Sequence, residues 1–217
     1  MSKAFLIDTS KCIFCKACQV ACKQWNELPA ERTTNRGSHQ NPPDLSAVTW
    51  TLVRVKEVTS NGKVGWLFFK DQCRHCVDPP CLMSASVPGS IYKDKDTGAV
   101  VYTEKTKYES FEDIMCPYNI PRQDPNTGRL FKCTMCIDRV KNGLLPACVK
   151  ACPTGALQFG DRDEMLALGQ QRLKAVKAVH RNAELVDVDE VSAFYLLTEE
   201  QDLYGMIKIP IDRAVFA

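Results

Sequence analysis

The spacing of twelve cysteines constrains this 217-residue chain more than any other feature. Residues 12–22 read C-x2-C-x2-C-x3-C, which is the spacing of cysteine thiolates that hold iron–sulfur clusters. Three cysteines two residues apart form a loop around one cubane cluster. The fourth, Cys22, lies about one helical turn beyond Cys18 and points elsewhere. The run therefore predicts ligands to two different [4Fe–4S] clusters.

A partner run lies at 133–152 and ends in the Cys-Pro pair that closes such runs. In two-cluster proteins each run gives three thiolates to one cluster and its last thiolate to the other. The first predicted cluster is held by Cys12, Cys15, Cys18 and Cys152. The second predicted cluster is held by Cys22, Cys133, Cys136 and Cys148.

The remaining cysteines predict one more cluster and one vacated site. A third [4Fe–4S] cluster is assigned to Cys73, Cys76, Cys81 and Cys116. The same crossed spacing would place a fourth ligand set at positions that carry no thiol, namely Ala85, Thr106, Glu109 and Glu112. Since these four losses remove one complete ligand set, the sequence predicts three [4Fe–4S] clusters.

Other uses of cysteine fit less well. A zinc site would explain the C-x2-C pair at 133–136 but not the three-cysteine loop at 12–18. Six disulfides would need an oxidising compartment, and the close pairs would crowd one another. Catalytic thiols would need a histidine base, yet His39 lies in a polar loop and His180 ends a predicted helix.

Charged and polar residues flank the ligands. His75 either donates a hydrogen bond to a cluster sulfur or takes part in electron exit, or it packs beside the third cluster. Cations near a cluster raise its reduction potential, because they stabilise the more negative reduced form. The flanking cations either act in this way or are solvated surface charges; they are Lys11, Lys16, Arg74 and Lys132.

The ligand runs are nested, which predicts an α+β fold of two nested ferredoxin-like [4Fe–4S] modules plus a β-hairpin, a C-terminal helix and a tail. The outer module comprises residues 1–70 with 126–160, including the hairpin over 48–69. The inner module is 71–125 and contains the vacated site. Residues 161–217 form a helix and a tail that wraps a partner.

Local patterns place the smaller elements. Asn, Pro and charged residues indicate a loop over 26–46, and two Asp/Asn-Thr-Gly turns lead into short strands. The predicted helix over 162–180 carries an apolar stripe, and apolar and polar residues alternate in the segment that follows it. The predicted ranges are strands at 99–102 and 130–131, a helix over 162–180, a strand within 183–197 and a tail over 198–217.

Composition excludes several function classes. Twenty-eight basic against 26 acidic residues give a net charge of +2, which offers no electrostatic case for nucleic acid. No apolar run approaches the roughly 20 residues of a membrane span, and the first residues lack a signal-peptide pattern. No phosphate loop, carboxylate pair or nucleophile–base set is present. The chain is predicted to transfer electrons and to carry no catalytic site.

Four segments carry a family resemblance. Residues 12–26 (CIFCKACQVACKQWN), 73–81, 132–139 (KCTMCIDR) and 146–155 (PACVKACPTG) resemble the iron–sulfur β subunits of molybdopterin oxidoreductases, above all those of formate dehydrogenases. The resemblance covers residues 10–165. Members commonly hold four clusters. The three clusters and the lack of a membrane anchor that are predicted for this chain resemble the soluble tungsten or molybdenum formate dehydrogenases.

The resemblance implies partners and a location. It implies a catalytic α subunit that oxidises formate at a bis-pterin W or Mo centre and has its own [4Fe–4S] cluster. A c-type cytochrome is the expected acceptor, and a periplasmic address follows from export together with the α subunit, with cytoplasm as the alternative. Two other functions stay open: a subunit of a dimethyl sulfoxide, nitrate, thiosulfate or polysulfide reductase, and a standalone polyferredoxin.

Overall fold

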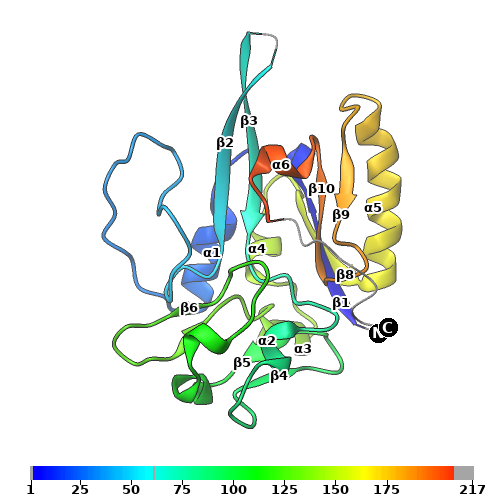
Figure 1. The fold of residues 1–217 in the computed structure, drawn as a ribbon. Helices are drawn as coiled ribbons and strands as arrows, with labels where there is room; N and C mark the ends of the chain where they lie inside the picture. Colours follow the sequence, from blue (N-terminus) through cyan, green and yellow to red (C-terminus); the bar gives the residue numbers. More distant parts are fainter. Residues whose placement is uncertain (1, 61, 208–217) are drawn as a thin grey trace.

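The computed structural model describes residues 2–60 and 62–207, which form a mixed α/β fold around a four-stranded sheet (Figure 1). The strand order is β8-β1-β10-β9, and β1 and β10 are the central, parallel pair, with Phe5 opposite Ala193. The outer two pairs are antiparallel. The strands are β1 (Lys3–Asp8), β8 (Leu157–Asp161), β9 (Glu184–Val186) and β10 (Ala193–Leu197). The sheet thus joins segments from the beginning and the end of the chain.

The central strands are buried on both faces. Helix α5 (Arg162–Lys177) packs along the sheet (Figure 1), and Phe194 lies in the same apolar cluster as Met165 of this helix. Tyr195, the next residue, belongs to a second cluster on the opposite face. Period-2 alternation places neighbouring side chains on opposite faces, so β10 contributes to both. The predicted helix over 162–180 is confirmed, although it ends at Lys177.

The predicted β-hairpin over 48–69 is also confirmed. Strands β2 (Leu52–Ser60) and β3 (Lys63–Asp71) form an antiparallel pair, with Leu52 opposite Asp71 at the base of the hairpin. The hairpin projects well beyond the rest of the chain (Figure 1), and its base ends beside the cysteine runs. The residues at the end of β3 are buried, because this end of the strand lies in the interior.

Short elements surround the cysteine runs. Both predicted turn-to-strand transitions are confirmed, since each closes a small antiparallel hairpin. The hairpin strands are β4 (Ile91–Lys93) with β5 (Val100–Tyr102), and β6 (Arg122–Gln123) with β7 (Leu130–Phe131). The helices are α1 (Ala17–Trp25), α2 (Pro80–Met83), α3 (Ile137–Lys141) and α4 (Ala147–Lys150). Three 3-10 turns are η1 (Thr9–Lys11), η2 (Glu104–Tyr108) and η3 (Phe111–Asp113).

The C-terminal segment differs from the expected single strand and tail. It contains two strands, β9 and β10, followed by the short helix α6 (Gln201–Tyr204). Tyr204 is 1% exposed, and its hydroxyl lies 2.9 Å from the Thr9 hydroxyl and 2.8 Å from that of Thr198. This buried ring anchors the described part of the tail on its own chain. The rest of the predicted tail, residues 208–217, lies outside the described residues.

Candidate iron–sulfur centres

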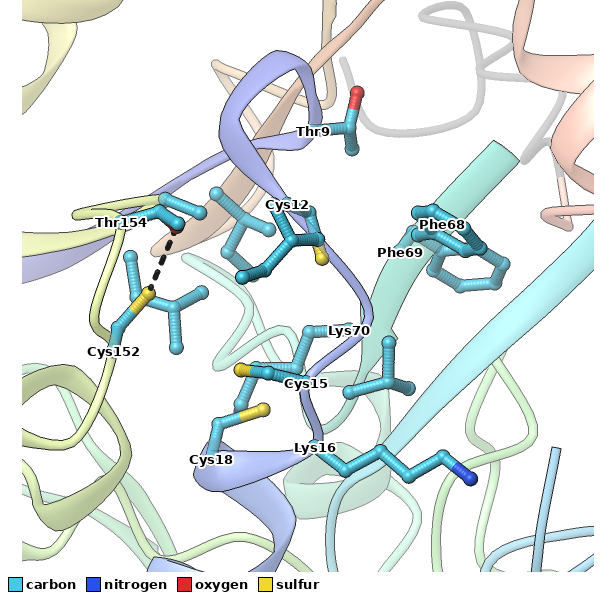
Figure 2. Close-up of a pocket in the computed structure, with 15 residues that line it drawn as sticks. Thr9, Cys12, Cys15, Lys16, Cys18, Phe68, Phe69, Lys70, Cys152 and Thr154 are labelled. Carbon is cyan, nitrogen blue, oxygen red and sulfur yellow. Dashed lines mark hydrogen bonds between the residues drawn. The ribbon is translucent and has the colours of Figure 1, made fainter. Parts of the chain in front are cut away.

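All twelve cysteines are free thiols, and they line three cavities in sets of four. The first cavity is lined by Cys12, Cys15, Cys18 and Cys152 (Figure 2). The second cavity is lined by Cys22, Cys133, Cys136 and Cys148. The third cavity is lined by Cys73, Cys76, Cys81 and Cys116. The fold therefore brings together the same sets of thiols that the spacing groups together.

Helix α1 explains why one cysteine run serves two cavities. Cys18 and Cys22 lie one turn apart on this helix, and both are buried. Cys18 faces the first cavity, whereas Cys22 reaches the second. Helix α4 packs against α1 and divides its run in the same way, with Cys148 in the second cavity and Cys152, just beyond the helix, in the first. The runs that contain these two helices thus each contribute thiols to both of the first two cavities.

Backbone turns direct N–H groups at several thiols. His75 has a φ of 49°, and its N–H donates to Cys73 Sγ at 3.4 Å. Met135 has a φ of 62°, and its N–H donates to Cys133 Sγ at 3.4 Å. Hydrogen bonds from N–H groups stabilise anionic sulfur and tune the potentials of iron–sulfur clusters. Two further donors are Ile120 N to Cys116 Sγ at 3.5 Å and Asn26 Nδ2 to Cys22 Sγ at 3.7 Å.

Several of the buried thiols are hard to ionise without a bound cation. Burial is the largest cause that raises the pKa of Cys18 and of Cys133 to about 12, and that of Cys136 to about 11. Neighbouring thiols raise these pKa values further, because thiolates repel one another. Metal ligation needs deprotonated sulfur, so cationic iron must provide the compensating charge. Four free thiols around one cavity fit a [4Fe–4S] cluster.

Lys70, at the end of β3, was not singled out from the sequence. Its side chain is 3% exposed and lines both the first and the second cavity (Figure 2 shows it beside Cys15 and Cys18). Burial lowers the pKa of Lys70, but negative thiolates on both sides raise it, and the net direction is upward. A lysine in an alternating hairpin strand reads as solvent-exposed, so nothing in the sequence pattern identifies it.

Two of the four flanking cations are buried rather than solvated. Lys132 is 4% exposed and lines the third cavity, and its ammonium donates to the Cys133 carbonyl at 3.1 Å and to the Val100 carbonyl. Arg74 is 3% exposed, and its guanidinium lies 4.2 Å from the centre of the Tyr195 ring. Lys11 and Lys16, in contrast, are partly exposed.

His75 packs in the protein interior. Its side chain is fully buried, and Nδ1 accepts a hydrogen bond of 3.1 Å from the Val100 N–H. Burial is the largest cause that holds the imidazole pKa well below its usual value, with nearby lysines acting in the same direction. A neutral ring that accepts at Nδ1 carries its proton on Nε2. The imidazole is not among the groups that line the third cavity.

One of the four positions of the predicted vacated site carries a buried carboxylate that accepts several hydrogen bonds. Glu109 is 5% exposed, and its carboxylate accepts from the Ser86 N–H at 3.0 Å, the Val87 N–H at 2.9 Å and the Ser90 hydroxyl at 2.5 Å. Thr106 is fully buried and accepts from a backbone N–H. Of the other two positions, Ala85 packs near an apolar cluster and Glu112 is exposed.

Glu109→Gln should destabilise the chain at neutral pH. Burial raises the carboxyl pKa, but the hydrogen bonds from Ser90, Val87 and Ser86 outweigh it and lower the pKa. A lowered folded-state pKa gives stability that is complete above the ordinary value of about 4.3 and is lost as pH falls through the folded value. An amide lacks the charge and presents N–H groups to donors, so we expect a loss of about 2–3 kcal/mol.

Calorimetry under anaerobic conditions tests this prediction. The apparent unfolding temperature of Glu109→Gln should fall by about 5–10 °C. The matched control is Glu112→Gln, an exposed residue at another vacated position, which should change the free energy of unfolding by less than about 0.5 kcal/mol. Equal effects of the two variants would contradict the structural role of Glu109.

Comparison with known proteins supports an iron–sulfur function. Residues 64–162 match the family model of the 4Fe-4S dicluster domain. The chain is 54% identical, over 94% of its length and 97% of the relative's, to formate dehydrogenase 2 subunit beta (cytochrome c-553) of Nitratidesulfovibrio vulgaris. It is 48% identical to the formate dehydrogenase subunit beta of Megalodesulfovibrio gigas, with the same coverage. It is 46% identical to the nitrate-inducible formate dehydrogenase iron-sulfur subunit of Escherichia coli, over 98% of this chain and 75% of that one.

The fold, the thiol cavities and the matching domain define an iron–sulfur protein of electron transfer. The chain belongs to the family of formate dehydrogenase iron–sulfur (β) subunits. The resemblance read from the cysteine segments is confirmed, and the role is that of a non-catalytic subunit of an oxidoreductase complex. These relatives do not favour another reductase or a standalone polyferredoxin. No helix in residues 2–60 and 62–207 has the length and hydropathy needed to cross a bilayer.

Proposed function

We propose that this chain holds three [4Fe–4S] clusters and relays electrons from formate oxidation on a catalytic α subunit to an external acceptor. The α subunit would contain a bis-pterin W or Mo centre and its own [4Fe–4S] cluster. Each of the three clusters accepts and gives up one electron at a time. The ligand sets are those of the three cavities. The observation that carries the proposal is that twelve free thiols divide into three sets of four.

The arrangement supports a linear relay in which the second cluster is the middle one. Lys70 lines the first and second cavities, which are therefore neighbours. The thiol of Cys73, in the third cavity, is close enough to Cys133, in the second, to raise its pKa. Cys15 of the first cavity is exposed, and Met115 beside the third cavity is 62% exposed. Electrons could thus enter and leave at opposite ends.

Metal and sulfide analysis of protein purified without oxygen tests the ligand assignment. We expect about twelve iron and about twelve sulfide per chain, because each [4Fe–4S] cluster contains four of each. About eight or sixteen iron atoms, or zinc in their place, would contradict three clusters. Co-purification with a large pterin protein, and dye reduction by formate in that complex, test the role in formate oxidation.

We further propose a periplasmic location, reached by export together with the α subunit, and a c-type cytochrome as acceptor. The name of the Nitratidesulfovibrio vulgaris relative includes cytochrome c-553, which supports a cytochrome partner. Cell fractionation would locate the chain, and reduction of purified c-type cytochrome by formate and the complex would test the acceptor. Recovery of the chain in the cytoplasmic fraction would contradict the proposed location.

A further inference from the structure

Lys70 places a buried ammonium group between two sets of cluster ligands. It lines the first and second cavities, and the thiols that act on it come from both sets, Cys18 from the first and Cys22, Cys133 and Cys148 from the second. Within the described part of the chain, its ammonium forms no ion pair with a carboxylate. Removing an unpaired charge from water is costly, so a buried lysine calls for a compensating negative charge nearby.

The fold fixes the backbone from which this buried side chain extends. The Lys70 carbonyl accepts a hydrogen bond of 2.6 Å from the Tyr195 hydroxyl on the central strand β10. Across the hairpin, Lys70 pairs with Val53, which is 2% exposed and also lines the first cavity. The end of β3 is therefore held from the sheet on one side and from β2 on the other. The buried side chain that this backbone carries lines both cavities, so its charge acts on both.

A fixed cation changes the energy of an added electron. Reduction makes a cluster more negative, and a nearby positive charge stabilises that state. The effect is stronger in a water-poor interior than at a surface, because screening is weaker there. One ammonium between two clusters therefore favours reduction of both and offsets the repulsion between them.

We propose that Lys70 is a positioning residue that raises the reduction potentials of the first and second clusters together and leaves the third unaffected. The inference rests on the proposed assignment of three clusters. It does not require Lys70 to change its protonation state. Its role is electrostatic. Lys132 differs from Lys70 because, of the three cavities, it lines only the third.

Redox titration of the purified complex, followed by EPR at constant neutral pH, tests the inference. In Lys70→Met the equilibrium constants for reducing the first and second clusters should each fall about tenfold, which is a shift of 59 mV for a one-electron couple. Lys70→Arg keeps the charge and should leave both midpoints close to wild type. Lys132→Met is the matched comparison and should lower the third midpoint but not the first.

The outcomes distinguish a failure of the proposed role of Lys70 from a failure of the three-cluster assignment on which it rests. Iron analysis of wild type decides whether three clusters are present. With three clusters present, unchanged first and second midpoints in Lys70→Met, or an equal shift of all three, would overturn the role of Lys70. An equal shift in Lys70→Arg would show that shape matters and charge does not, which also overturns it. If Lys70→Met fails to load iron, Lys70→Gln is judged by the same criteria.

Discussion

Replacing Cys22 with serine should remove the second cluster and leave the first and third in place. Cys22 lines the second cavity, although it belongs to the cysteine run that otherwise serves the first. Serine is a poor ligand for iron compared with a thiolate, and a cubane with three protein thiolates is readily lost. We expect iron to fall from about twelve to about eight atoms per chain. Electron transfer through the complex should fail, because the proposed relay loses its middle cluster.

EPR spectra of paired variants give the sharper test. Cys22→Ser should remove the same signal as Cys133→Ser, although the two residues are far apart in sequence. The matched control is Cys18→Ser, which lies one turn from Cys22 on α1 and should remove the signal of the first cluster instead. If Cys18→Ser and Cys22→Ser removed the same signal, the crossed ligand sets would be wrong.

The grouping of thiols around the cavities is predictable from sequence, because the spacing of cysteines in such runs is local and repetitive. Loops of fixed length set which thiols converge, and a single helical turn decides which thiol leaves the set. The cavities collect the thiols in the same groups that this reasoning gives. The hairpin and helix α5 follow from alternation and from a 3.6-residue period, so they are predictable for the same local reason.

The central sheet is not predictable in this way. Its parallel pair joins β1 to β10, and no local pattern records a partner at the opposite end of the chain. The tail over 198–217 was expected to wrap a partner, but Tyr204 is buried against Phe69 of the hairpin in its own chain, with the ring centres 6.1 Å apart. Lys70 was missed because its burial depends on where β3 ends in the assembled fold.

The largest loss of stability should follow from Phe194→Ala on the central strand. Phe194 is fully buried on the face of the sheet that packs against α5, in one apolar cluster with Leu6 and Met165. Truncating a buried phenylalanine removes apolar contact and leaves a cavity, which costs about 3–5 kcal/mol. Calorimetry should show an unfolding temperature lower by about 6–20 °C.

A control substitution at an exposed site and the EPR spectra of the clusters test whether the effect of Phe194→Ala is specific to packing. Val179 is 80% exposed just beyond α5, so Val179→Ala should change the free energy of unfolding by less than about 0.5 kcal/mol. Phe194 lines none of the three thiol cavities, although its apolar cluster also contains Cys73 and Cys133. Folded Phe194→Ala should therefore retain about twelve iron atoms and wild-type EPR signals. Loss of iron from the folded variant would mean that the packing around Phe194 is needed to hold the cluster ligands.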